Sequence, residues 1–165
     1  MKVVSALPLL AIAATASSVR NIFNLISSGG SDDSHNGLYL STQHIDPLNS
    51  DAVFRDSDDA ADFYLDNGTV RYVAPNGAPF ALALDSGDEV QGSVEISVSP
   101  LFGSTGFNIT SDNTLETANQ SWGGWLVCDR SDGLLGLYYE NNGAGSNLLE
   151  ECDAIALDVV YKPIS

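Results

Sequence analysis

The sequence has 165 residues, of which 22 are acidic and six are basic, and its formal net charge is -16 at pH 7. So negative a chain repels nucleic acid and anionic lipid, and we expect neither as a partner. The excess of acid suits a soluble chain or one that works among cations. A solvated anionic surface is favoured over calcium binding because no coordinating loop is visible in the sequence.

The first residues are typical of a signal peptide. Lys2 precedes the apolar run Val3–Ala13, which is too short to span a bilayer, and the small residues Ala14-Thr15-Ala16 follow. We expect cleavage after Ala16 or nearby, with a signal peptide over residues 1–16 and one secreted domain over residues 17–165. The alternative is a buried N-terminal strand or helix. The C-terminal VVYKPIS lacks the features of a lipid-anchor signal, so no membrane anchor is expected.

The rest of the chain lacks helical periodicity. Runs of aromatic and β-branched residues alternate with clusters of Gly, Asn, Asp, Ser and Pro, which predicts short strands joined by turns. The polar, glycine-rich segment 27–36 is expected to be a surface loop. The predicted strands are Asn21–Ile26, Gly37–His44, Ala52–Arg55, Asp62–Leu65, Thr69–Val73, Phe80–Leu84, Ser93–Val98, Gly106–Thr110, Thr114–Thr117, Trp125–Cys128, Leu134–Tyr139 and Ala154–Tyr161.

One hairpin is explicit in the segment DFYLDNGTVRYV. Asn67-Gly68 tolerates the positive φ angles of a two-residue turn, and strand-like runs flank it. Phe63 and Leu65 alternate with Tyr64, so one face is expected to pack and the other to meet water.

A faint repeat suggests the architecture. The segments that begin FYLDNGTVRYV at Phe63 and FNITSDNTLET at Phe107 share an order of strand, Asn turn, strand, glycine-bearing loop and strand. A four-strand unit that recurs at this period is what a three-fold β-trefoil needs, although its third copy would have to combine both ends of the chain. We therefore predict a single antiparallel all-β domain of about 10–12 short strands, a β-trefoil-like barrel, with a β-sandwich as the alternative.

The stretch SWGGWLVCDRSDGLLGLYY gathers both tryptophans of the chain and two tyrosines. Flat rings on an exposed strand face would form a sugar-stacking platform, whereas buried rings would supply the core of a small β domain. Core packing is favoured, because one sequence cannot show that these rings share an exposed face. The candidate platform residues are Trp122, Trp125, Tyr138 and Tyr139.

The chain has two cysteines, Cys128 and Cys152, and an isolated pair in an oxidising compartment most simply forms one disulfide. A catalytic cysteine would need a histidine beside it. His35 and His44 lie in a different part of the sequence, which argues against a Cys/His nucleophile.

Three sequons for N-linked glycosylation follow the pattern Asn-x-Ser/Thr, and they begin at Asn67, Asn108 and Asn119. Asn67 lies in the predicted tight turn and Asn119 in a polar connection, positions where a glycan can face water.

The order of these elements resembles the fungal small secreted cell-wall protein family that includes the phialide-development cell-wall protein. The shared features are a signal peptide, a mid-chain hairpin that begins with Phe-Tyr, and a late pair of cysteines, and they fall here on Phe63, Tyr64, Leu65, Gly68, Cys128 and Cys152. The chain differs from the family's pattern in lacking further cysteines, so no second disulfide is expected. The resemblance implies a non-enzymatic extracellular or wall-associated protein and assigns no catalytic residue.

Catalytic patterns are sparse. Asp56, Asp58 and Asp59 form a carboxylate cluster that could in principle cleave glycosides, but acidic runs are usually solvated. No Gly-x-Ser-x-Gly elbow, zinc spacing or phosphate loop occurs. We therefore expect no enzyme, cofactor or metal, and predict a secreted, N-glycosylated cell-wall or extracellular protein with a structural or surface role, whose partners are wall polysaccharide or extracellular proteins. The alternatives are a carbohydrate-binding effector or antigen and, after that, a small acid-active hydrolase.

Overall fold

The computed structural model describes residues 20–85, 90–98, 103–143 and 152–163, so the expected signal peptide at residues 1–16 lies outside the described residues. The described residues contain twelve β-strands and two short 3-10 helices, η1 (Asp33–His35) and η2 (Ser57–Asp59), and no α-helix, which confirms the predicted all-β class. Each predicted strand overlaps an observed one. The strands are β1 (Phe23–Ser28), β2 (Tyr39–His44), β3 (Asn49–Arg55), β4 (Phe63–Asp66), β5 (Thr69–Tyr72), β6 (Ala81–Leu84), β7 (Gln91–Ser97), β8 (Phe107–Ile109), β9 (Leu115–Thr117), β10 (Trp122–Asp129), β11 (Leu135–Asn141) and β12 (Cys152–Tyr161).

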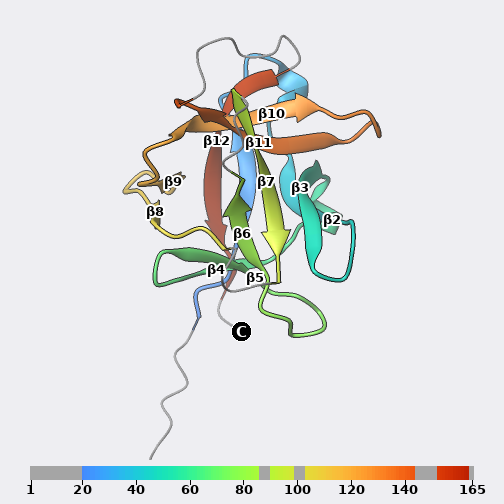
Figure 1. The fold of residues 1–165 in the computed structure, drawn as a ribbon, viewed down its shortest axis with the longest axis vertical. Coiled ribbons are helices and arrows are strands. Elements are labelled where there is room, and N and C mark those ends of the chain that lie inside the picture. Colours follow the sequence, from blue (N-terminus) through green and yellow to red (C-terminus); the bar gives the residue numbers. More distant parts are fainter. Residues whose placement is uncertain (1–19, 86–89, 99–102, 144–151, 164–165) are drawn as a thin grey trace, which may run out of the picture.

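Ten of the strands form one antiparallel sheet in the order β10-β12-β1-β2-β3-β11-β7-β6-β5-β4. Further pairings of β10 with β11, β1 with β4, and β3 with β7 close this sheet on itself, so the fold is barrel-like (Figure 1). Closure matters because it removes the exposed sheet edges through which β proteins aggregate.

The pairings join distant parts of the chain. Strand β1 pairs with β12 along its whole length, from Phe23 opposite Tyr161 to Ser28 opposite Ala156. Strands β3, β7 and β11 pair with one another in all three combinations. The barrel is therefore stabilised by strand pairings between segments that are far apart in the sequence.

The small second sheet, β8 and β9, lies against the barrel. The Phe107 N–H donates to Gly68 O at 2.9 Å, and the Val159 N–H donates to Asn113 O at 2.7 Å. The β8–β9 hairpin is thus tied to the β4–β5 turn on one side and to β12 on the other.

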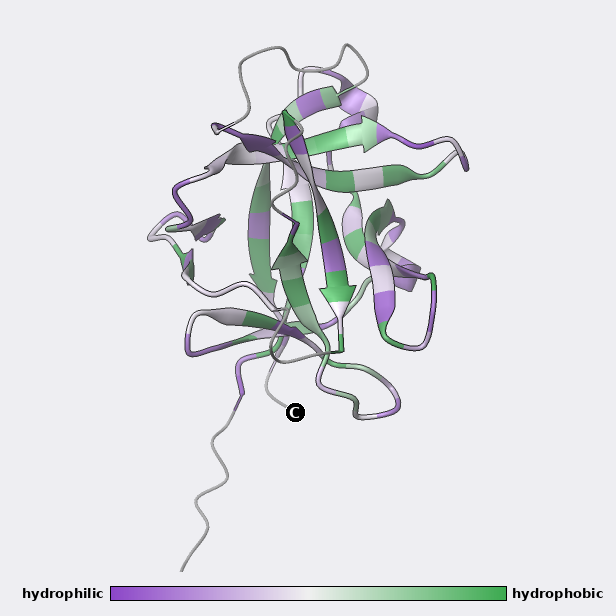
Figure 2. Cartoon of the chain, viewed as in Figure 1, coloured by the Kyte–Doolittle hydropathy of each residue, from purple (hydrophilic) through white to green (hydrophobic). Residues whose placement is uncertain are grey.

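Alternation along the strands builds the core, as predicted for half-buried strands. Every second residue is buried in β1 and in the middle of β12, from Ile155 to Val159, and in Figure 2 hydrophobic residues concentrate on the central strands. The Asn67-Gly68 turn is confirmed, with φ angles of 49° and 77° that suit Asn and Gly. Among the residues described, no helix is long and apolar enough to cross a membrane.

Candidate functional site

Two of the four candidate platform residues are buried, as the interpretation of these rings as core packing expects. Trp125 is 2% exposed and Tyr139 is 0% exposed. The Trp125 indole N–H donates to Leu115 O at 2.6 Å, and the Tyr139 hydroxyl donates to Asp85 O at 2.8 Å. Both rings are core residues whose polar tips are satisfied internally, so neither can stack on a ligand.

The other two platform residues do not share an open face. Trp122 is half-buried and its ring packs edge-on against Trp125, with 5.5 Å between ring centroids. Tyr138 is half-buried on β11, paired with Leu126 of β10. The aromatic stretch therefore supplies packing, and the place for a ligand has to be sought elsewhere on the barrel.

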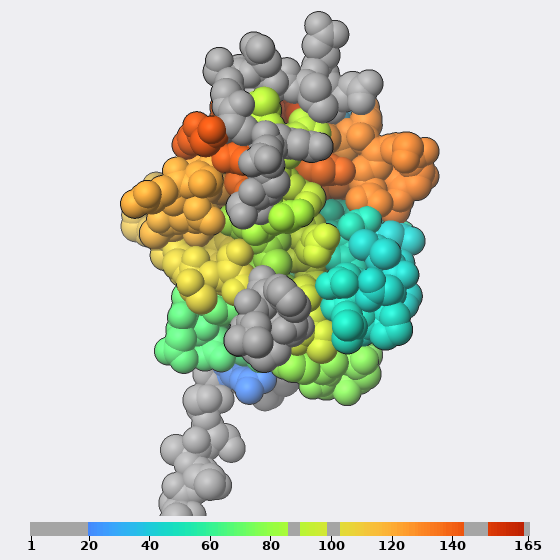
Figure 3. All heavy atoms as spheres, viewed as in Figure 1, coloured from blue at the N-terminus to red at the C-terminus, as the bar shows by residue number. Residues whose placement is uncertain are grey.

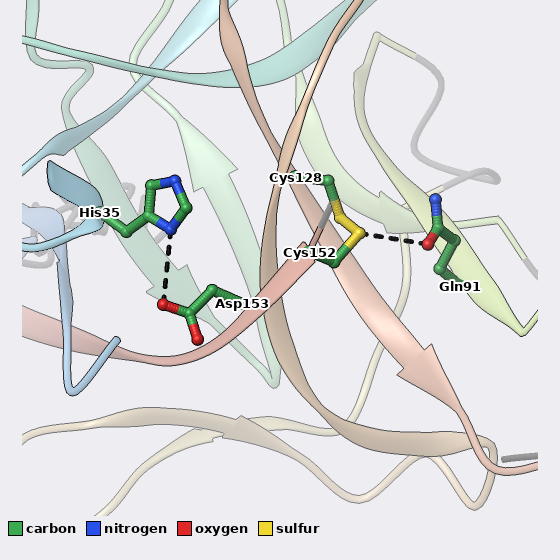
Figure 4. The surroundings of a disulfide bond; sticks show 5 residues. All are labelled: His35, Gln91, Cys128, Cys152 and Asp153. Atoms are coloured by element: carbon green, nitrogen blue, oxygen red, sulfur yellow. Dashed lines mark hydrogen bonds and ion pairs between the residues drawn. A yellow bond between two sulfur atoms is a disulfide. The ribbon is translucent and has the colours of Figure 1, made fainter. Parts of the chain in front are cut away.

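The predicted disulfide is present. Cys128 and Cys152 are directly opposite each other in the β10–β12 pair and are joined by a bond of 2.02 Å between their Sγ atoms (Figure 4). Gln91 Oε1 lies 3.2 Å from Cys152 Sγ. A disulfide sulfur carries no hydrogen, so this is a contact of the amide with the sulfur rather than a donated bond.

A histidine lies near the disulfide, although it is far from both cysteines in the sequence. His35 Nδ1 lies 3.4 Å from Oδ2 of Asp153, the residue after Cys152 (Figure 4). The pKa of Asp153 is lowered, chiefly by the Asp32 backbone N–H and also by Ser31 and His35. Because both cysteines are oxidised, no thiol is present for His35 to activate. The arrangement fixes the loop that contains η1 against β12.

The predicted carboxylate cluster is solvated. Asp56, Asp58 and Asp59 lie in and before η2 and are all exposed. Glycoside cleavage needs two carboxyls held across a bound sugar, which an exposed turn does not provide. In the part of the chain that the structure describes, no group of three or more His, Cys, Asp or Glu residues could hold a metal ion.

One carboxyl with a raised pKa lies on β7. Glu95 is opposite Asp51 of β3 in the strand register, and it borders a shallow pocket with Asp85. Its pKa is raised by burial first and then by the charges of Asp85, Asp51 and Asp46. Asp51 is itself paired with Arg130 at 2.6 Å. An unpaired acid facing other acids is a local cost to the fold, and we assign it no chemistry.

A larger pocket opens where the first and last strands meet the β4–β5 turn. This mouth pocket has a volume of about 500 Å³. Its walls come from the start of β1, the end of β4 and its turn, the end of β12, and β8. In Figure 3 the blue atoms of the first described residues lie beside the green β4–β5 segment. The lining residues are Arg20, Asn21, Phe23, Tyr64, Leu65, Asp66, Asn67, Ile109 and Tyr161.

Two tyrosines line the mouth pocket, one with an exposed ring and the other beneath a guanidinium. Tyr161 is 48% exposed and packs edge-on against the buried Phe23, with 5.9 Å between ring centroids. Tyr64 is half-buried, and the Arg20 guanidinium lies 4.5 Å from its ring centroid. A cation held over a ring is attracted by the ring's negative face, which orders both side chains.

Polar groups complete the mouth pocket. Asn21 and Asp66 are exposed on its walls, and Arg20 adds a cation. Beside it, Lys162 Nζ pairs with both carboxylate oxygens of Asp62 at 2.8 Å. Flat rings with a few hydrogen-bonding groups around them are the elements from which small-ligand sites are built.

The three sequon asparagines are all exposed, and they lie on one side of the molecule. Asn67 precedes Gly68, which accepts from Phe107 N–H, and Asn108 follows Phe107 on β8. Asn119 follows Ala118, whose N–H donates to Gly106 O at 2.9 Å. The β4–β5 turn and the β8–β9 hairpin are neighbours in Figure 3, the latter in yellow and orange.

Sequence reasoning did not identify the mouth pocket. The one residue in the sequence that could have indicated the mouth pocket was Tyr64, an aromatic residue on the strand face that was expected to meet water. Tyr161 and Arg20 gave no signal, because only the pairing of β1 with β12 brings them beside β4.

No curated protein and no solved structure matches the chain. A model of a domain of unknown function, DUF7907, matches residues 20–161. This match includes all twelve strands of the described structure, from the start of β1 to the end of β12. The chain therefore belongs to the DUF7907 family.

Proposed function

We propose that the chain is a secreted, N-glycosylated protein with a non-enzymatic role at a cell wall or in the extracellular space, and that it associates with neutral carbohydrate through the mouth pocket. The observation that supports this is the mouth pocket itself, in which the exposed Tyr161 and the half-buried Tyr64 lie among Arg20, Asn21 and Asp66. A cell-wall role of the kind implied by the resemblance to fungal small secreted cell-wall proteins agrees with such a site.

The chemistry of the mouth pocket suits a sugar. The exposed ring of Tyr161 matches the apolar face of a pyranose ring, and a guanidinium, an amide and a carboxylate match the sugar hydroxyls. A volume of about 500 Å³ is within the usual range for small-ligand sites. The site would hold a short stretch of a chain rather than a long polymer.

Charge favours a neutral polysaccharide over an acidic one. The net charge of -16 repels anionic polymers at long range, and a single arginine at the mouth does not offset it. Chitin and β-glucan are neutral, so they are the appropriate probes.

Three features support secretion. A disulfide persists in oxidising compartments, and one joins β10 to β12. The sequence begins with a signal-peptide pattern, and its three sequon asparagines are accessible. All three features suit a chain that passes through the secretory route.

We also propose that the barrel is a β-trefoil. Three sets of pairings support a three-fold arrangement: the hairpins β2–β3, β6–β7 and β10–β11, the mutual pairs of β3, β7 and β11, and the pairs β1–β12, β4–β5 and β8–β9. Each set maps onto itself when every strand number is increased by four and the count continues from β12 to β1. The repeat that starts at Phe63 and Phe107 aligns β4–β7 with β8–β11 in the same way.

A pull-down tests the function. The secreted mature protein is incubated with insoluble chitin, with β-glucan and with isolated wall material, beside the variants Tyr161→Ala and Tyr138→Ala. Loss of one stacking contact should weaken retention by roughly two- to tenfold in Tyr161→Ala. Tyr138→Ala is the matched control because this ring lies outside the mouth pocket.

Circular dichroism of each variant ensures that the fold is intact. Saturable retention that Tyr161→Ala weakens and Tyr138→Ala leaves unchanged is the expected result. Absence of retention both before and after deglycosylation, or equal retention of both variants and the parent protein, would contradict the proposed site.

A further inference from the structure

One sequon asparagine is part of the mouth pocket. Asn67 lines it from the β4–β5 turn, and its side chain is exposed there. Its Nδ2 donates to Asp66 Oδ1 at 3.0 Å, and Asp66 is another lining residue. A glycan on Asn67 would therefore start at the wall of the pocket.

We propose that a glycan on Asn67 closes the mouth pocket to external carbohydrate, so that occupancy of this one sequon regulates binding. The inference rests on the proposed function, because it concerns the same site and the same class of ligand. It adds a modification that competes with that ligand.

The competition follows from tethering. A sugar attached at the pocket wall is present at an effective concentration on the order of millimolar, whatever the concentration of external ligand. Its first residues carry the same ring faces and hydroxyls as the polysaccharide, so they suit the same tyrosines. An external chain has to displace them before it can bind.

The local hydrogen bond holds the tether near the site. The amide nitrogen of a glycosylated asparagine keeps one hydrogen, so Asn67 can still donate to Asp66. The backbone at Asn67 is in the left-handed region, with φ of 49°, which the Asn-Gly turn stabilises. The glycan is thereby attached to an ordered turn rather than to a loose loop.

The other two sequons provide matched controls. Asn108 is on β8 next to Ile109, a lining residue, but consecutive side chains on a strand point to opposite faces. Asn119 follows β9 and does not line the mouth pocket. Glycans at Asn108 and Asn119 would have the same chemistry as a glycan at Asn67 and lie on the same side of the molecule, but they would not start at the mouth pocket.

The experiment removes each glycan in turn. Asn67→Gln, Asn108→Gln and Asn119→Gln are secreted from the same host as the parent, and intact mass before and after deglycosylation reports which glycans are present. Retention on chitin and β-glucan is then measured. Loss of the Asn67 glycan should strengthen retention by roughly three- to tenfold, because the tethered competitor is gone. The other two variants should bind like the parent.

A second variant controls for any effect that Asn67→Gln itself has on the β4–β5 turn. Thr69→Val removes the sequon while Asn67 keeps its left-handed backbone, and Thr69 is buried, where valine has nearly the same shape. It should match Asn67→Gln in retention.

The outcomes separate this inference from the proposed function. Equal retention of the parent, Asn67→Gln and Thr69→Val would overturn the inference and leave the carbohydrate site standing. An unmodified Asn67 in the secreted parent would overturn it as well. If no form binds any polysaccharide, including those without the Asn67 glycan, the proposed function itself fails.

Discussion

Removal of the Cys128–Cys152 disulfide should destabilise the barrel chiefly through its unfolded state. The bond spans a sequence separation of 24 residues, and the closed loop contains all of β11, which pairs with β3, β7 and β10. Freeing a loop of this length increases the entropy of the unfolded chain, which corresponds to roughly 3.5 kcal/mol at 25 °C. The double variant Cys128→Ala/Cys152→Ala should therefore lose about that much free energy of unfolding. The melting temperature should fall by roughly 7–14 °C.

Urea denaturation followed by circular dichroism measures this loss. The native spectrum should not change, because β10 and β12 are still paired through Trp125, Leu126 and Val127. The parent protein with its disulfide reduced is the control, and it should lose a similar free energy. A loss below about 1 kcal/mol in both would refute the loop-closure reasoning. A changed native spectrum would instead show that the bond shapes the folded barrel.

Two further changes test the core and the acid on β7. Trp125→Phe should cost about 1–3 kcal/mol, because it leaves the Leu115 carbonyl buried without its donor, whereas Trp122→Phe should cost less, since that indole N–H has no partner among the described residues. Equal losses in urea denaturation would contradict this. Glu95→Gln should raise the melting temperature at neutral pH. The pKa of Glu95 is raised in the folded state, so the parent protein loses stability as the pH rises through this pKa and the side chain becomes charged, whereas glutamine stays neutral. Parent and variant should converge when melted near pH 3, and a gap that persists there would show that charge is not the cause.

Local patterns predicted the strands and the hairpin well. Alternation around Phe63 and the Asn67-Gly68 turn both depend on neighbouring residues, and both are found in the structure. The disulfide could be predicted from the count of two cysteines and the expectation of an oxidising compartment. These features could be predicted because their physical causes lie within a few residues or in the composition.

The candidate site could not be predicted in the same way. Alternation assigns a ring to a face of its strand, but burial depends on what covers that face, and Trp125 and Tyr139 turned out to be covered. The mouth pocket joins Tyr64 of β4 and Tyr161 of β12 to Arg20, which precedes β1, and no local signal indicates that these segments meet. For the same reason His35 lies beside Asp153 although the sequence separates them widely.

The long pairing of β1 with β12 sets an order of events in the making of the protein. As the chain is synthesised, β1 lacks its longest partner until the last strand has emerged, so the barrel cannot close before then. Thr69, the hydroxyl-bearing residue of the Asn67 sequon, is buried once the barrel is closed. Any enzyme that reads this hydroxyl has to do so on the unfinished chain. Late closure provides that interval, and the speed of folding would then decide what fraction of molecules carries a sugar at the mouth pocket.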